Sequence, residues 1–116
     1  MATIAEETRP DIATLDIRPL TPAIGAEILD IDLGATNISE RIPDIRAALL
    51  RHGVIFFREQ RLTQEQQIAF ARHFGNLEIH PATPQAQANR EVLRIAHGPD
   101  SRGQENHWHS DVSSRR

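Results

Sequence analysis

The sequence predicts an α+β fold with mainly β character, in which two helices are flanked by several short strands. Short apolar runs bounded by glycine and proline are typical of strands, and two longer segments repeat their apolar residues at helical spacing. The chain has no strand–helix–strand repeat and no glycine-rich phosphate loop. A parallel α/β fold is therefore not expected.

The first elements are expected to be two strands paired as a hairpin. Residues 15–20 alternate apolar and polar side chains, and residues 24–33 form a second apolar run punctuated by Gly25 and Gly34. Thr21 and Pro22 lie between the two runs and favour a turn. The spacing predicts a short connection and antiparallel pairing.

A first helix is expected between Ser39 and Gly53. Pro43 is tolerated in the first turn, where its missing N–H would have no helical partner. Apolar side chains then recur three, four and seven residues apart, ending at His52, and glycine commonly follows the last turn. The next run, residues 54–57, is continuously apolar and predicts a strand buried on both faces, followed by an exposed turn at residues 59–61.

A second helix is marked by a capping box at Thr63 and Gln66. Phe70 and Phe74 lie four residues apart on one face, and Gly75 is expected to end the helix. Beyond it, residues 81–90 predict a loop, 91–96 a strand, 98–103 a polar turn and 107–112 a strand.

Composition excludes several classes of protein. The net charge is −3, so neither a nucleic-acid partner nor an anionic membrane is expected. The chain contains no cysteine, which excludes disulfides and thiolate metal sites. The N-terminus lacks the features of a secretory signal, and no apolar run approaches the roughly 20 residues that span a bilayer. We expect a cytoplasmic protein with a flexible tail over residues 1–14; a homo-oligomer is left open.

The segment with the clearest chemistry is His109-Ser110-Asp111. On a strand, residues two apart face the same side, with Cα atoms about 6.6 Å apart. One imidazole and one carboxylate are two of the three ligands of a non-haem iron(II) facial triad, which needs a second histidine and leaves three positions open. The alternative is a solvated pair at a strand end. His107 shares the face, but a span of about 13 Å to residue 111 argues against ligation.

Trp108-His109-Ser110-Asp111-Val112 resembles the signature of the taurine dioxygenase (TauD/TfdA) family. The resemblance covers roughly residues 15–113, with further blocks in the family's order at residues 17–20, 24–28, 50–58, 70–75 and 79–81. It implies a double-stranded β-helix, or jelly roll, with flanking helices. It also implies iron(II) held by His109 and Asp111, with 2-oxoglutarate as cosubstrate and dioxygen as oxidant. The reaction would hydroxylate a C–H bond of a small anionic substrate and release succinate and carbon dioxide.

The resemblance also implies three substrate contacts. His80 falls on the family position that helps bind the sulfonate of the substrate, where an imidazolium would bond to the anion. The alternative for His80 is a histidine that is exposed or caps a turn. Asn106 and Val112 are further candidates, for which a turn residue and barrel packing are the alternatives.

The chain departs from the family pattern in two respects. Thr83 follows the His-Pro pair where the family carries a polar aromatic residue, and the chain has no tyrosine. Taurine itself is therefore in doubt, and other sulfonates, alkyl sulfates and aryloxy acids stay open. The distal histidine ligand and the arginine that binds 2-oxoglutarate are missing. Residues 15–116 are thus expected to be the N-terminal portion of a truncated dioxygenase domain, inactive alone. The alternatives are a non-catalytic remnant, a small binding protein, or a chain that binds metal only beside a second chain.

Overall fold

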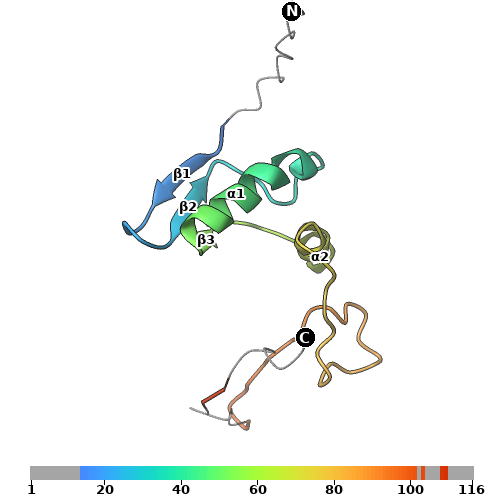
Figure 1. Cartoon of the computed structure of the whole chain (residues 1–116). Coiled ribbons are helices and arrows are strands. Elements are labelled where there is room, and N and C mark those ends of the chain that lie inside the picture. Colours follow the sequence, from blue (N-terminus) through green and yellow to red (C-terminus); the bar gives the residue numbers. More distant parts are fainter. Residues whose placement is uncertain (1–13, 102, 104–107, 110–116) are drawn as a thin grey trace, which may run out of the picture.

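A computed structural model describes residues 14–101, 103, 108 and 109. In that part the chain forms strands β1 (Asp16–Pro19) and β2 (Ala26–Leu29), then the 3-10 helix η1 (Ile38–Arg41), and then helix α1 (Ile42–His52). Strand β3 (Ile55–Phe56) and helix α2 (Gln64–Arg72) follow (Figure 1). A small mixed sheet with helices agrees with the predicted α+β class. The mainly β character stays a prediction, because helix outweighs strand in the described residues.

The three strands form one sheet in the order β1-β2-β3. β1 and β2 are antiparallel, with Asp16 opposite Leu29 and Pro19 opposite Ala26, which confirms the hairpin. β2 is shorter than predicted because Asp30 takes a φ of 51°, a left-handed conformation that ends the strand. β3 runs parallel to β2, and α1 forms the crossover between them.

Helix α1 begins and ends as its residues predict. Pro43 lies in its first turn, and the 3-10 turn η1 leads directly into it. Gly53 follows the last turn with a φ of 74°, and its N–H donates to the Leu49 carbonyl at 2.8 Å. Only glycine adopts that backbone conformation without steric cost, so the helix stops there and the chain returns to the sheet.

The core lies between α1 and one face of the sheet. Ile28 of β2 and Ile45 of α1 are its largest fully buried side chains. Ile17, Ile55 and Phe57 are partly buried against the same cluster. Because neighbouring strand residues point to opposite faces, this packing leaves Glu27 and Phe56 on the other face of the sheet.

Helix α2 begins with the predicted capping box. The Gln66 N–H donates to Thr63 Oγ1 at 3.1 Å, and the Thr63 N–H donates to Gln66 Oε1 at 2.9 Å. The helix ends at Arg72, before the predicted stop at Gly75, because the next three N–H groups bond three residues back in tighter turns. No helix in the described residues is long and apolar enough to cross a membrane.

Two predicted strands differ from the structure. β3 is only two residues long and is not buried on both faces, since Val54 and Phe56 are 42% and 43% exposed. It is an edge strand, and within the described residues its outer side has no strand beside it. The strand predicted at residues 91–96 is absent; its apolar alternation finds no neighbouring strand in the described part of the chain, and Ile95 is largely exposed.

The remaining predictions concern the last third of the chain. Residues 81–90 form turns and coil, as expected of a loop. The Ser101 N–H donates to the Gly98 carbonyl at 3.1 Å, which confirms a turn there. The strand predicted at residues 107–112 lies outside the described residues except for 108 and 109, which belong to no strand. Of the tail predicted at residues 1–14, only residue 14 is described.

Candidate functional site

His80 lies in the connection that follows α2, and its side chain is exposed. Its ring Nδ1 accepts a hydrogen bond from the Ala82 N–H at 3.1 Å, and its carbonyl accepts one from the Thr83 N–H at 2.9 Å. His80 therefore caps the turn that begins at Pro81. A neutral ring that accepts at Nδ1 carries its proton on Nε2, which is then the atom able to donate to another group.

Thr83 follows this turn and is only 4% exposed. Its Oγ1 is buried and has no hydrogen-bond partner within the described part of the chain. Leaving a buried hydroxyl unpaired costs free energy. The chain therefore buries a short polar side chain shortly after His80.

The connection is fastened to α2 by polar side chains. Asn89 Nδ2 donates to Gln64 Oε1 at 3.0 Å and to Glu65 Oε1 at 3.1 Å, both at the beginning of α2. At the other end of the helix, Arg72 forms an ion pair with Glu91 at 3.1 Å. These contacts hold residues 89–91 along the helix, downstream of His80.

Inside the connection, a single amide closes a loop. Gln87 Nε2 donates to the carbonyl of Asn89 at 2.8 Å and to that of Val92 at 2.6 Å, in a half-buried position. The loop thus gains order from side chain–backbone bonds instead of a strand ladder. Neither Gln87 nor Asn89 carries a local sequence signal for this role, since both lie in a polar stretch that predicts only a loop.

Among the residues predicted to hold iron, His109 is described and exposed, beside a fully exposed Trp108. Asp111 lies outside the described residues, as do His107, Asn106 and Val112. The shared face of His109 and Asp111 and the contacts of Asn106 and Val112 therefore stay predictions. In the described residues no three histidine or acidic side chains come together as a metal site. The donor types supplied by His109 and Asp111 still fit iron(II).

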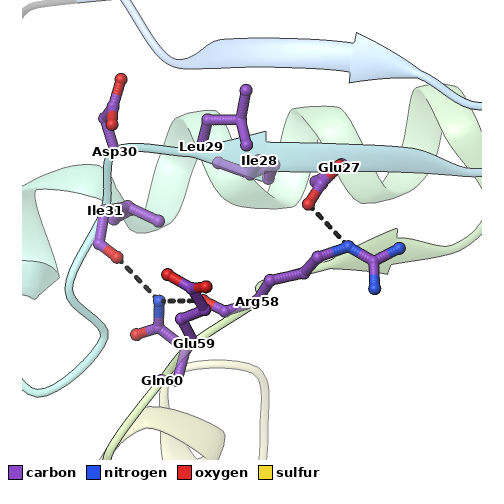
Figure 2. Close-up of a pocket in the computed structure, with 8 residues that line it drawn as sticks. All are labelled: Glu27, Ile28, Leu29, Asp30, Ile31, Arg58, Glu59 and Gln60. Atoms are coloured by element: carbon purple, nitrogen blue, oxygen red, sulfur yellow. Dashed lines mark hydrogen bonds and ion pairs between the residues drawn. The ribbon is translucent and has the colours of Figure 1, made fainter.

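A groove of about 440 Å³ opens between β2 and the segment after β3 (Figure 2). Arg58 Nε lies 2.7 Å from Glu27 Oε1 across it. Gln60 Nε2 donates to the Ile31 carbonyl at 2.8 Å, while its Oε1 accepts from the Leu33 N–H at 3.0 Å. The sequence predicted only an exposed turn here. The groove contains none of the predicted site residues.

The chain is similar in sequence and in part of its fold to 2-oxoglutarate-dependent dioxygenases. The family model described as "Taurine catabolism dioxygenase TauD, TfdA family" matches residues 16–116. The chain therefore belongs to the TauD/TfdA family.

Two curated relatives are similar over most of this chain. One is an alpha-ketoglutarate-dependent sulfate ester dioxygenase of Pseudomonas putida, 36% identical over 114 residues, which covers 97% of this chain and 37% of that protein. The other is an alkylsulfatase of Acinetobacter baylyi, 38% identical over 100 residues, which covers 85% of this chain and 31% of that protein. The chain thus spans about a third of their length.

A solved structure supports the fold. The crystal structure of a taurine dioxygenase from Burkholderia xenovorans superimposes with a TM-score of 0.53 at 44% sequence identity. The match covers 57% of this chain and 24% of that one. The described elements are therefore part of the same fold.

Proposed function

We propose that this chain supplies the first two iron ligands and part of the substrate site of an iron(II)- and 2-oxoglutarate-dependent dioxygenase. His109 contributes an imidazole and Asp111 a carboxylate, and the remainder of a jelly-roll domain contributes the second histidine and the arginine for 2-oxoglutarate. The family match carries this proposal because it runs through the His-x-Asp segment. Residues 15–116 are the N-terminal portion of that domain.

The chemistry that iron and 2-oxoglutarate supply when bound is hydroxylation of a substrate C–H by dioxygen, coupled to decarboxylation of the cosubstrate. The residues of this chain hold and orient the reactants. His109 and Asp111 would hold the metal as two of its protein ligands, and a non-haem iron site of this donor type has open positions for the cosubstrate and for dioxygen. Asn106 and Val112 flank the two ligands in sequence, and we place them at the substrate.

The proposed substrate is an organic sulfate or sulfonate. His80 carries the argument, because its Nδ1 is occupied by the Ala82 N–H and its exposed ring leaves Nε2 as the donor. One N–H directed at a sulfate or sulfonate oxygen suits a tetrahedral anion. The Pseudomonas putida and Acinetobacter baylyi relatives are a sulfate ester dioxygenase and an alkylsulfatase, which favours sulfate esters.

The residues are tested in a chimera in which this chain is continued by the C-terminal part of the Pseudomonas putida relative. With iron(II), 2-oxoglutarate and an alkyl sulfate, the chimera releases succinate in step with sulfate. His80→Asn keeps an acceptor near the position of Nδ1 but removes the Nε2 donor. It raises KM for the alkyl sulfate and leaves KM for 2-oxoglutarate unchanged.

The matched control is His73→Gln, a change at another exposed histidine after α2, which leaves both KM values unchanged. Succinate release that does not depend on any sulfate or sulfonate would contradict the substrate class. An unchanged KM in His80→Asn would remove His80 from the substrate site.

A further inference from the structure

Arg46 of α1 reaches across to the end of α2. Its Nη2 donates a hydrogen bond to the His73 carbonyl at 3.1 Å, between residues 27 positions apart. His73 directly follows the last residue of α2, and the final carbonyls of a helix have no partner inside it. A cation at this end is also favoured by the helix dipole. Arg46 therefore holds the point at which the chain leaves α2.

The same guanidinium closes a row of aromatic rings. It lies 5.5 Å from the centroid of the Phe74 ring, within the range of a cation–π contact. The Phe74 ring lies 5.3 Å from that of Phe70, which lies 6.0 Å from that of Phe57 in an edge-to-face arrangement. All three rings pack against the apolar core. One side chain of α1 thus contacts both the backbone and a ring at the exit from α2.

The segment that begins at this exit carries His80, six positions after Phe74. Its downstream end is held to α2 by the amide of Asn89 and by the ion pair of Glu91. His80 itself bonds within its own turn, through its ring Nδ1 and its carbonyl. The position of the His80 ring relative to the core therefore depends on how the two ends of the segment are held.

We propose that Arg46 is a positioning residue for His80, and through His80 for the sulfate or sulfonate group of the substrate. The inference rests on the proposed function, in which His80 Nε2 donates to that anion. Without Arg46, the upstream end of the segment can shift, and a smaller fraction of molecules presents Nε2 correctly. The apparent affinity for the substrate falls with that fraction. The loss falls on binding of the organic sulfate, because His80 contacts neither iron nor 2-oxoglutarate in the proposed site.

The test uses the chimera in which this chain is continued by the C-terminal part of the Pseudomonas putida relative. Arg46→Ala removes both contacts of the guanidinium, whereas Arg46→Lys keeps a cation that can donate to the same carbonyl. Arg51→Ala, at an exposed arginine of the same helix, is the matched control. Succinate release is measured against the concentration of an alkyl sulfate and, separately, of 2-oxoglutarate.

Arg46→Ala is expected to raise KM for the alkyl sulfate about threefold, the size of one exposed charged contact. Its kcat and its KM for 2-oxoglutarate stay unchanged. Arg46→Lys recovers much of the loss, and Arg51→Ala leaves all three parameters as they were. In a His80→Asn background Arg46→Ala has no further effect, because the residue through which it acts is already gone. A purely stabilising role of Arg46 would instead act equally in both backgrounds.

The contact itself is checked in the 116-residue chain. The N–H groups of residues 73–75 are hydrogen-bonded at the end of α2, and Arg46→Ala should lower their protection against hydrogen exchange. Unchanged protection overturns the inference. Circular dichroism shows whether each variant is folded. If Arg46→Ala is not, Arg46→Met takes its place, since it keeps the apolar stem and loses both contacts.

Two kinetic results separate this inference from the proposed function. An unchanged KM for the alkyl sulfate in Arg46→Ala, or an equal rise with and without His80, overturns the inference while the proposed function stands. Succinate release by the unmodified chimera that does not depend on any sulfate or sulfonate contradicts the proposed function, and the inference fails with it.

Discussion

The two halves of the described chain differ in the contacts that stabilise each of them. Between residues 15 and 68 lie all of the buried apolar side chains, which pack the sheet against α1 and reach α2. From residue 76 to residue 101 there is no helix or strand, and polar side chains bond this part of the chain to α2. Figure 1 shows the same division, with the sheet and α1 gathered together and the later chain trailing beyond α2.

The difference separates the part of the chain that forms the scaffold from the part that carries the candidate site residues. The buried apolar side chains lie in the N-terminal half, whereas His80 and His109 lie beyond them. A site built from such segments becomes rigid only when further structure packs around it. In the proposed dioxygenase this chain would supply two ligands, and the rest of the domain would complete their geometry.

The largest expected effect is a loss of stability when the core of the N-terminal half is disrupted. Ile45 is completely buried at the centre of the core. Ile45→Ala removes buried methyl groups and leaves a cavity, and should lower the free energy of unfolding by about 2–5 kcal/mol. Leu50→Ala on the same helix is the control, because Leu50 is 81% exposed. Urea titration followed by circular dichroism measures both; equal losses would show that α1 does not pack as described.

A smaller loss of stability is expected at Gln60, whose side-chain amide joins the two segments that line the groove. Gln60→Ala removes its bonds to Ile31 and Leu33. We expect a loss of about 1–3 kcal/mol, because half-buried backbone groups lose their partner. Gln67→Ala, at an exposed position of α2, should change the same urea midpoint very little. A Gln60→Ala midpoint indistinguishable from that of Gln67→Ala would rule out the bridge.

The next largest loss of stability is expected at the capping box of α2. Thr63→Ala removes the acceptor for the Gln66 N–H and should cost about 1 kcal/mol. Thr63→Ser keeps the hydroxyl and should restore most of the stability. The thermal midpoint of each variant provides the measurement. If serine does no better than alanine, the side-chain cap does not hold the start of α2.

The smallest effect on stability is expected from the polar contacts that tie residues 89–91 to α2, which we call the polar tether. The pKa of Glu65 is lowered from 4.5, first by a hydrogen bond from its own backbone N–H and then by the Asn89 amide. A lowered folded-state pKa means that this stabilisation is present above pH 4.5 and is lost as the pH falls through the folded value. The protection of residues 84–92 against hydrogen exchange, measured relative to the intrinsic exchange rate at each pH, should therefore fall below that point.

The matched variants separate this tether from general acid sensitivity. Asn89→Ala speeds exchange of the same residues at neutral pH and weakens its dependence on acid. Asn37→Ala, which removes a side chain that caps no helix, leaves both unchanged. If exchange in Asn89→Ala matches that of the unmodified chain, the Asn89 side chain does not order these residues.

Local signals in the sequence predicted the scaffold well. Pro43 and Gly53 mark the limits of α1, and Thr63 with Gln66 marks the start of α2, because each acts on backbone groups within one turn. The faces of β3 were predicted wrongly, since burial of a strand depends on distant neighbours. The same holds for the strand expected at residues 91–96, whose apolar pattern has no partner among the described residues.

In the candidate site, too, some features could be predicted from the local sequence and others could not. The turn-capping alternative for His80 could be read from the adjacent proline, and the Ala82 bond to its ring agrees with it. The bridge formed by Gln60 joins residues 29 positions apart, so no local pattern could reveal it. The pairing of His109 with Asp111 came from strand periodicity and stays a prediction, because Asp111 lies beyond the described residues.

Anaerobic titration with iron(II) and 2-oxoglutarate, followed by visible absorption, tests the central claim that His109 and Asp111 hold the metal. The chimera with the Pseudomonas putida remainder should develop a charge-transfer band, which His109→Ala and Asp111→Ala abolish and His107→Ala preserves. The 116-residue chain alone should show no band, because two ligands hold iron(II) weakly. A band from the 116-residue chain alone, or one that survives in His109→Ala or Asp111→Ala, would contradict the account.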